Sequence, residues 1–410
     1  MKRMILFCLL MLSACLPPQA LHARHTHIAP DSLTQDSVRF SLLTCEAGEE
    51  IYTLFGHTAI RYENTAKGID VVFNYGMFSF NVPNFALRFA LGKTDYQLGV
   101  TNFRRFAAEY QWSGRNVWQQ TLNLTDEEKK RLWTALSENY LPENRVYRYN
   151  FFCDNCATRP RDQIENCVDG EISYHEQTDS MHVANELSWR DLLHCYTAGH
   201  PWSRFGIDLC IGSAADRPVS LRERMFVPFC MQQYFRQASI LSDKGESRPL
   251  VGDEKLIVQA ELTENVADYL PTPLQTSLLL FILVDCTSIF ALKRRYSLWG
   301  LDALLFATAG AAGCIIAFLV LFSTHPAVSP NWLLCVFHPF HLICLPFVVI
   351  RVKKKKLSWY MAINTLVLTL FILLFAIIPQ FIPPAVVPLA LCLLTRSACN
   401  LILSRRTAEE

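Results

Sequence analysis

Two short motifs, far apart in the chain, carry the side chains that acyl-transfer chemistry needs. The first, Phe55–Arg61, reads FGHTAIR and places His57 on a segment that is predicted to be a strand. The second, Asp154–Arg159, reads DNCATR and places Cys156 at a predicted helix start. A thiol that passes its proton to a neighbouring imidazole becomes a nucleophile for acyl groups. The pair therefore predicts a cysteine enzyme with Cys156 as nucleophile and His57 as base.

Two cysteines compete for the role of nucleophile. Cys153 ends an extended aromatic run, whereas Cys156 follows Asp154 and Asn155, either of which can cap a helix that continues to Ile164. The free N–H groups and the dipole of a first helical turn favour a thiolate and stabilise an oxyanion. This placement favours Cys156 and makes Asn155 a candidate substrate contact; a purely structural role for the cysteine is the alternative.

A predicted hairpin supplies a partner for the imidazole. The β-rich segments 58–62 and 69–75 flank a turn-like loop at 64–68. If the segments pair around that loop, the numbers of facing residues add up to about 132, which brings Asn74 close to His57. Asn74 is thus a candidate to orient the imidazole through a hydrogen bond. A register shift of one residue would remove this contact, because it moves side chains to the other face of the sheet.

Other charged and metal-binding residue types give weaker signals. Arg159 and Arg161 are candidates for a phosphate contact, or else they pair with Asp154 or Asp162. No group of histidines has the tight spacing of a metal site, so the sequence predicts neither a metal nor a cofactor. The net charge of +1 gives no sign of a nucleic-acid partner.

The N-terminus has the pattern of an export signal. A basic start precedes the apolar run Met4–Leu12, which is too short to span a bilayer. Leu12–Cys15 resembles a lipobox, in which case Cys15 would carry lipid; ordinary signal-peptidase cleavage near Ala20 or Ala23 is the alternative. The chain after the signal is therefore expected outside the cytoplasm.

The C-terminal third is expected to cross a membrane. Hydrophobic residues make up 51% of the chain, and they gather in about five stretches of spanning length: 273–291, 299–322, 331–350, 358–378 and 383–403. The basic clusters follow the first, third and fifth stretches, and the two opposite loops carry no Lys or Arg. The positive-inside rule puts the clusters in the cytoplasm and the preceding domain in the periplasm.

Some polar residues in this third are candidates for function. Arg396 is expected to pair with Asp302 or Asp285, either for function or only to hold the helices together. His325 lies in an external loop, where it is expected to face lipid headgroups. The chain then divides into a signal peptide (1–23), a periplasmic α+β domain (24–242), a linker (243–272) and a five-span transmembrane domain (273–404).

The motifs together resemble those of a known family. The order of Gly56-His57-Thr58 before Asn155-Cys156 is similar to circularly permuted papain-like thiol enzymes, which are related to the NlpC/P60 cell-wall peptidases. A closer resemblance is to the Lnb family of bacterial lipoprotein N-acyltransferases. The segments that carry it are Tyr52–Arg61, Phe73–Gly76, Lys93–Val100, Tyr149–Asp162, His325-Pro326 and Asn331–Leu334.

This resemblance implies both a fold and a reaction. The fold would be a permuted papain-like periplasmic domain followed by an all-α bundle of about five transmembrane helices. The reaction would acylate the α-amine of diacylglyceryl-cysteine on lipoproteins, with phospholipid as donor and a Cys156 thioester as intermediate. The rivals are an envelope hydrolase, either an amidase or peptidase or else a phospholipase, and a non-enzymatic envelope sensor or assembly protein.

Overall fold

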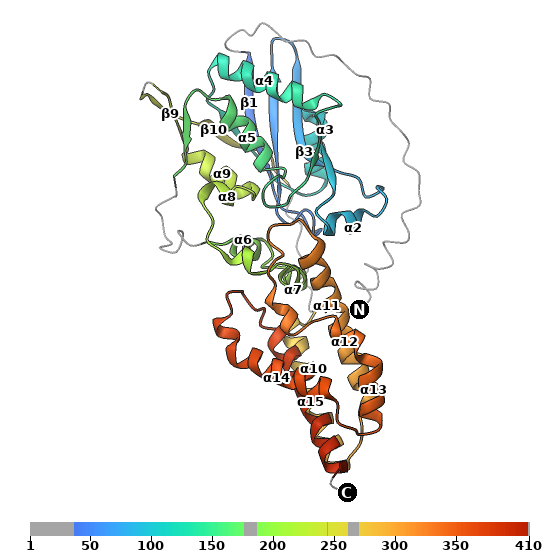
Figure 1. The fold of residues 1–410 in the computed structure, drawn as a ribbon. Coiled ribbons are helices and arrows are strands. Elements are labelled where there is room, and N and C mark those ends of the chain that lie inside the picture. Colours follow the sequence, from blue (N-terminus) through green and yellow to red (C-terminus); the bar gives the residue numbers. More distant parts are fainter. Residues whose placement is uncertain (1–36, 176–186, 244, 261–269, 409–410) are drawn as a thin grey trace. The chain divides into compact units, whose positions relative to one another are not determined.

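The computed structural model describes residues 37–175, 187–243, 245–260 and 270–408 (Figure 1). The expected signal peptide and Cys15 lie outside these residues. A strand-rich domain comes first and a helical region follows, so the expected order of an α+β domain and an all-α membrane domain is confirmed.

The first domain is built on one antiparallel sheet of seven strands. Its order across the sheet is β10-β5-β1-β2-β3-β4-β6. The strands are β1 (Val38–Cys45), β2 (His57–Asn64), β3 (Ile69–Met77), β4 (Asp95–Asn102), β5 (Val117–Leu122), β6 (Val146–Arg148) and β10 (Val251–Val258). The central strands β1, β2 and β3 are almost wholly buried, because helices cover both of their faces.

Helices on the two faces of the sheet enclose separate apolar cores. On one face α4 (Asp126–Tyr140), α5 (Thr158–Cys167) and α9 (Pro228–Gln237) cover the sheet, and α3 (Phe103–Trp112) covers the other face (Figure 1). Leu132, Ile164 and Phe235 belong to the first core, and Phe106 and Tyr110 to the second. Strands β2 and β3 carry His57 and Asn74, and the turn before α5 carries Cys156.

The register of the β2–β3 hairpin differs by one from the expected value. Ile60 faces Phe73 and Asn64 faces Ile69, so the numbers of facing residues add up to 133 rather than 132. Continued by one pair, this register puts Asn74 opposite Ala59. Side chains alternate along a strand, so Asn74 shares a face with His57 in this register, whereas a sum of 132 would have placed Asn74 opposite Thr58, on the other face.

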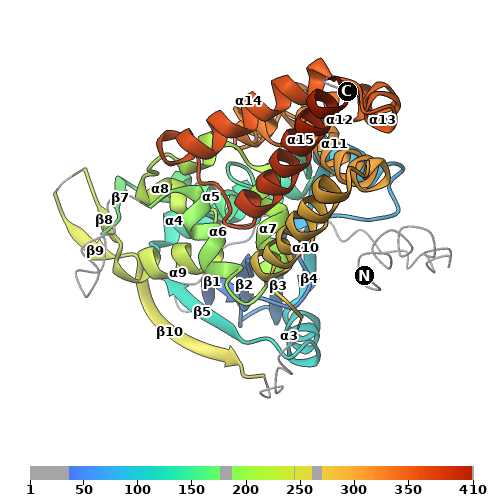
Figure 2. The same cartoon turned by 90° about the horizontal axis from the view of Figure 1, so that it is seen from below.

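The domain extends further than the sequence indicated. Residues 243–272 were expected to be a linker, but β10 within them pairs antiparallel with β5 and forms an edge of the main sheet (Figure 2). This strand has several exposed positions, including Asp253 and Lys255. Charged side chains are common on edge strands because they prevent further pairing, and they explain why the segment resembles a linker in sequence.

Smaller elements complete the first domain. They are α2 (Phe85–Ala90), α6 (Trp189–Tyr196), α7 (Pro201–Cys210), the 3-10 turn Ser213–Asp216 and α8 (Leu221–Arg224), with a second sheet of β7 (Glu171–Ser173), β8 (Ser239–Leu241) and β9 (Ser247–Pro249).

Four described helices are long and apolar enough to cross a membrane, or five if one bent pair counts as a span. The membrane region contains α10 (Pro273–Arg294), α11 (Trp299–Phe322), the 3-10 turn Trp332–Cys335, α12 (Phe340–Ile343), α13 (Leu345–Lys353), α14 (Trp359–Leu374), the 3-10 turn Phe375–Ile377 and α15 (Val386–Ala408). The third expected span, 331–350, is therefore not one straight helix: its two parts meet at 75°. Pro339 and Pro346 interrupt it, since proline removes a backbone donor.

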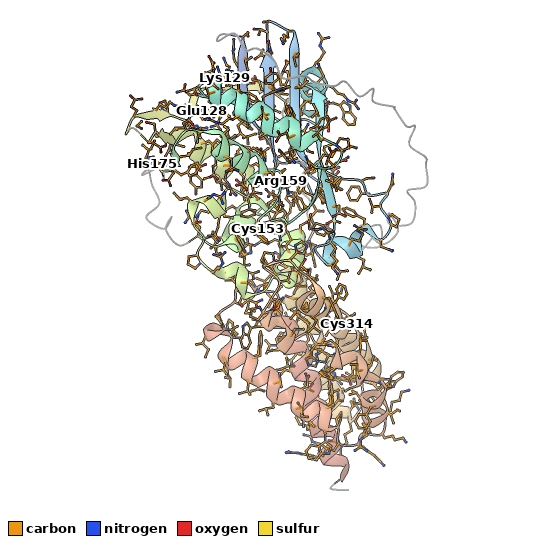
Figure 3. All side chains as sticks on the ribbon, turned by 45° about the horizontal axis from the view of Figure 1, so that its top comes forward. Glu128, Lys129, Cys153, Arg159, His175 and Cys314 are labelled. Atoms are coloured by element: carbon orange, nitrogen blue, oxygen red, sulfur yellow. The ribbon has the colours of Figure 1, made fainter. Side chains whose placement is uncertain are left out.

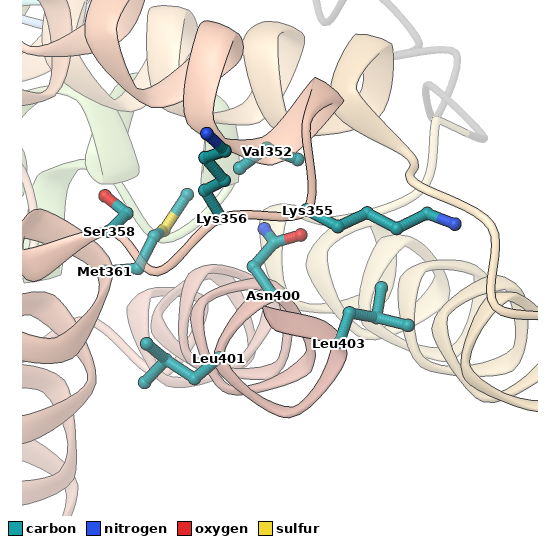
Figure 4. Close-up of a pocket in the computed structure, with 8 residues that line it drawn as sticks. All are labelled: Val352, Lys355, Lys356, Ser358, Met361, Asn400, Leu401 and Leu403. Atoms are coloured by element: carbon teal, nitrogen blue, oxygen red, sulfur yellow. The ribbon is translucent and has the colours of Figure 1, made fainter. Parts of the chain in front are cut away.

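Contacts at the two ends of the helices agree with the expected orientation. At one end Gln380 donates to Asn331 at 3.1 Å, and Asn331 donates to the carbonyl of Leu209 in the periplasmic domain. At the other end the Lys353 ammonium lies 3.8 Å from the centre of the Trp299 ring. Lys355 stands there beside α15 (Figure 4). The basic clusters thus share the end opposite the periplasmic domain.

A buried polar cluster joins three membrane helices. Arg396 of α15 donates to Asp302 of α11 at 2.6 Å and to Ser288 of α10 at 2.9 Å, and Asn400 donates to the same carboxylate at 3.0 Å. Arg396 and Asp302 are wholly buried. Figure 2 shows α10, α11 and α15 side by side. Of the two expected partners, Asp302 is the one that Arg396 contacts.

We predict that Arg396→Met destabilises the protein by about 3 kcal/mol, because it leaves the Asp302 carboxylate buried without its cation. Thermal unfolding in detergent micelles measures the effect as a lower melting temperature. The double variant Arg396→Met/Asp302→Leu should recover most of the loss, and Arg406→Met, at an exposed position, is the matched control. A single variant as stable as the control would contradict the prediction.

Candidate active site

Cys156 lies in a tight turn rather than in the first turn of a helix. The following helix, α5, begins at Thr158, so the thiol precedes it. The Asn155 side chain accepts from the N–H groups of Ala157 and Thr158 at 2.8 and 2.9 Å. The Asn155 N–H in turn donates to the Thr158 hydroxyl. The Asn155 side-chain oxygen thus pairs with the free N–H groups at the start of α5. Because Asn155 precedes Cys156, the thiol stays outside the helix.

Asn155 has no capacity left for substrate. Its amide nitrogen donates to the carbonyls of Phe151 and Phe226, both at 2.8 Å, and the residue is 2% exposed. The sequence suggested a substrate contact here. The structure instead places Asn155 as the residue that fixes the turn around Cys156.

The half-buried thiol lies at the start of β2. The backbone N–H of Thr58, the residue after His57, is directed at the Cys156 sulfur. A Cβ atom at Gly76 of β3 would lie 3.3 Å from the Cys156 Cβ. Gly76 also has a φ of +90°, which a side chain would strain. The chain thus leaves room for Cys156 beside the strand that begins with His57.

The imidazole of His57 is held by Asn74. His57 Nε2 lies 3.2 Å from Asn74 Oδ1, so the expected contact is present. An amide oxygen only accepts hydrogen bonds, so Nε2 carries the hydrogen. In the neutral ring Nδ1 is then left as the acceptor for a proton. Asn74 is 7% exposed and fixes the tautomer as well as the ring's orientation.

Both members of the pair are neutral before substrate binds. Burial lowers the pKa of His57 to about 4, although the Asn74 hydrogen bond opposes this. Burial also raises the pKa of Cys156 to about 11, and the Thr58 N–H only partly offsets the rise. The thiolate that the helix start was expected to favour is therefore not the resting form. A nucleophilic role for Cys156 would therefore require a base to take its proton during attack.

Tyr147 is a residue that the motif analysis missed. Its ring is 6% exposed, and its hydroxyl proton has no acceptor among the described residues, although the Gly76 N–H is directed at the hydroxyl oxygen. Burial raises the pKa of this tyrosine, and a negative charge at Cys156 adds to the rise, so the two groups are close enough to interact. A buried donor without an acceptor costs free energy, so this one is a candidate for donation to a bound ligand. Its position in the aromatic run just before the nucleophile was the available signal.

Arg159 is occupied by protein partners. Its guanidinium donates to Asp154 at 2.9 Å and lies 3.6 Å from the centre of the Tyr147 ring. Figure 3 shows Arg159 and the exposed Cys153 in the periplasmic domain. Arg161 likewise donates to Asp162 at 2.7 Å. Of the two readings for these arginines, the structure favours pairing with Asp over free phosphate contacts.

The two remaining candidates lie away from Cys156. The Nε2 of His325 lies 2.8 Å from the backbone oxygen of Phe89. Because a carbonyl oxygen only accepts, this ring nitrogen is the donor. Arg396 is in the ion pair with Asp302 near the opposite end of the membrane helices. No group of three or more metal-binding side chains occurs in the described part of the chain.

The fold and its membrane helices define a multi-pass inner-membrane protein with a periplasmic N-terminal domain. Comparison with family models is in agreement. The model of the Lnb N-terminal periplasmic domain matches residues 27–194, and that of the Lnb transmembrane domain matches residues 264–408. Together they cover more than half of the chain, which belongs to the Lnb family. This membership indicates a membrane protein of lipoprotein processing. Searches of curated proteins and of solved structures found no match.

We predict that alkylation of Cys156 by iodoacetamide rises about tenfold per pH unit from pH 7 to pH 10, because only the thiolate reacts and its pKa is about 11. Peptide mass spectrometry separates Cys156 from Cys153, which provides an exposed reference thiol in the same molecule. A rate that is already at its plateau below pH 8 would mean that the resting pair is an ion pair, contrary to this prediction.

Proposed function

We propose that this protein is a lipoprotein N-acyltransferase. It takes a fatty acyl chain from a phospholipid, holds it as a Cys156 thioester and transfers it to the α-amine of diacylglyceryl-cysteine on a lipoprotein. The observation that carries the proposal is the half-buried thiol at the start of β2: the Thr58 N–H is directed at its sulfur, and the preceding residue, His57, has its tautomer fixed by Asn74. Membership of the Lnb family supports a lipoprotein as the acceptor. The proposed donor and acceptor are both anchored in the periplasmic leaflet, next to the periplasmic domain.

The first half-reaction forms the acyl-enzyme. The Cys156 proton moves to His57 Nδ1 while the sulfur attacks the carbonyl carbon of the phospholipid ester. The resulting tetrahedral oxyanion collapses, the C–O bond breaks, and the lysophospholipid oxygen leaves with the proton from the imidazolium. Covalent catalysis divides one difficult acyl transfer into two easier steps.

The second half-reaction uses the same groups in reverse. The lipoprotein amine, in its neutral form, attacks the thioester carbon and loses a proton to His57. The C–S bond then breaks, and the imidazolium returns the proton to the Cys156 sulfur. An amide forms and the free thiol is restored, so no oxidant, metal or cofactor enters the balance.

The oxyanion of both steps needs hydrogen-bond donors. Two groups of this chain support that role: the Thr58 N–H, which is directed at the Cys156 sulfur, and the Tyr147 hydroxyl, whose proton has no acceptor among the described residues. Donors that are already oriented in a buried site stabilise developing negative charge more than water does. The low exposure of Tyr147 favours this over a solvated surface role.

We predict that Cys156→Ser abolishes lipoprotein N-acylation, because a serine hydroxyl is a far weaker nucleophile in this setting. Incubation with phospholipid should add one acyl chain to Cys156 in the intact-mass spectrum of the unmodified protein. The matched control is Cys153→Ser, which removes the exposed neighbouring thiol and should leave activity unchanged.

The same experiment separates the rival functions. Free fatty acid or muropeptide fragments, released without N-acylation, would replace the transferase by an envelope hydrolase. Normal N-acylation by Cys156→Ser, together with unchanged activity of His57→Ala, would instead support a non-enzymatic role for the pair.

We predict that Tyr147→Phe lowers the rate of acyl-enzyme formation about a hundredfold with little change in KM, because the lost donor acts only on the transition state. Single-turnover kinetics with excess enzyme measures the rate. Tyr75→Phe, which removes a hydroxyl bonded to Asn139 away from the thiol, serves as the control. A Tyr147→Phe variant with an unchanged rate would remove the hydroxyl from the mechanism.

A further inference from the structure

Exposed apolar side chains gather on two neighbouring parts of the periplasmic domain. Of the large hydrophobic residues exposed between 37 and 258, about half belong to segments 51–52 and 77–89, and the rest are scattered singly. We call these two segments, together with residues 90 and 91, the aromatic lip. Its exposed members are Ile51, Tyr52, Met77, Phe80, Val82, Leu87 and Phe89. A contiguous apolar surface of this kind marks an interaction site.

The helix in the lip is largely exposed. None of the residues of α2 is fully buried, although its sequence is FALRFA, and only Phe85 packs against the core. Residues 71–94 contain no Asp or Glu; of their two bases, Arg88 pairs with Asp95 at 2.9 Å and Lys93 is exposed. A surface of apolar residues with a base and few carboxylates suits the polar boundary of a phospholipid leaflet, where phosphates repel carboxylates.

The lip touches the outer end of a membrane helix. His325 Nε2 donates to the Phe89 backbone oxygen at 2.8 Å, and the Thr324 hydroxyl donates to the Leu91 oxygen at 3.1 Å. Both residues follow Phe322, the end of α11. The lip therefore continues the surface where α11 leaves the bilayer, which fixes its depth at the periplasmic boundary (Figure 1).

Aromatic rings connect the lip to the surroundings of the thiol. Phe89 stacks on Phe85, Phe85 on Phe78, Phe78 on Tyr96 and Tyr96 on Tyr149, with ring centres 4.0 to 6.3 Å apart. Burial raises the pKa of both tyrosines at the end of this series, and a charge at Cys156 adds to the rise. Gly76, against Cys156, immediately precedes Met77 of the lip. Packed aromatic side chains thus connect the lip at the membrane boundary with the surroundings of the nucleophile.

We propose that the aromatic lip inserts into the periplasmic leaflet and receives the acyl chain of the phospholipid donor on its way to Cys156. The occupant is a membrane phospholipid, because the lip lies where a transmembrane helix ends and has the composition of an interfacial segment. The delivery of an acyl chain rests on the proposed function; the insertion into the leaflet does not.

Photo-crosslinking tests the insertion without any catalysis. p-Benzoyl-phenylalanine replaces Phe80 in the full chain carrying Cys156→Ser, so that any added mass is not a thioester. The protein is reconstituted in vesicles of dioleoylphosphatidylcholine and dioleoylphosphatidylglycerol and irradiated. The matched control places the same probe at Leu241, which is 42% exposed on β8. The neighbouring strand β9 lies on the opposite side of the domain from α2 in Figure 1.

We expect the mass of one phospholipid on the position-80 protein and none on the position-241 protein. Equal lipid addition at both positions, or none at position 80, would overturn the insertion. Because the probe protein is inactive by design, this result does not depend on whether the protein is an acyltransferase.

A second measurement tests acyl delivery. Phe80→Ser/Leu87→Ser should slow acylation of Cys156 by vesicle phospholipid about tenfold or more, because two apolar side chains that enter the leaflet are lost. Acylation by the water-soluble ester p-nitrophenyl butyrate should stay unchanged, as should both rates for Leu241→Ser. An equal loss with both donors would show a merely structural role for the lip, and an unchanged phospholipid rate would overturn delivery.

Discussion

The hydrogen bond between His57 Nε2 and Asn74 Oδ1 is the constraint on which the rest of the site depends. Because the amide oxygen only accepts, it leaves Nδ1 as the basic nitrogen of the ring. The bond exists only if the β2–β3 register is correct, since a shift of one residue turns Asn74 to the opposite face. The seven-stranded sheet, with cores on both faces, fixes this register and thereby the orientation of the His57 ring.

Burial gives the pair a particular electrostatic character. The pKa of His57 falls to about 4 and that of Cys156 rises to about 11, so proton transfer in the resting state is unfavourable. A bound ester and the donors near the sulfur must stabilise the charge that develops. The nearby Arg159 adds little net charge, because Asp154 neutralises it. The same burial limits the access of water to the thiol.

The sequence predicted the His57 strand, its contact with Asn74 and the basic clusters on one side of the membrane, because each depends on local spacing or charge. It missed three features that depend on distant parts of the chain. The Asn155 side chain satisfies the start of α5 and so leaves Cys156 before the helix. The charged segment of β10 becomes a strand only because β5 is available for pairing. The break in the third span arises at prolines, which a measure of hydropathy does not register.

The membrane helices are tied together by an ion pair at the cytoplasmic end and contact the periplasmic domain at the other end. Asp302 lies in the first turn of α11 and holds Arg396, while His325 follows the far end of the same helix. Twenty helical residues separate Asp302 from Phe322, a length of about 30 Å. The ion pair is therefore too remote to touch a substrate at Cys156. Its role follows from its position: it ties α10, α11 and α15 together, so that the outer end of α11 presents a fixed edge to the periplasmic domain.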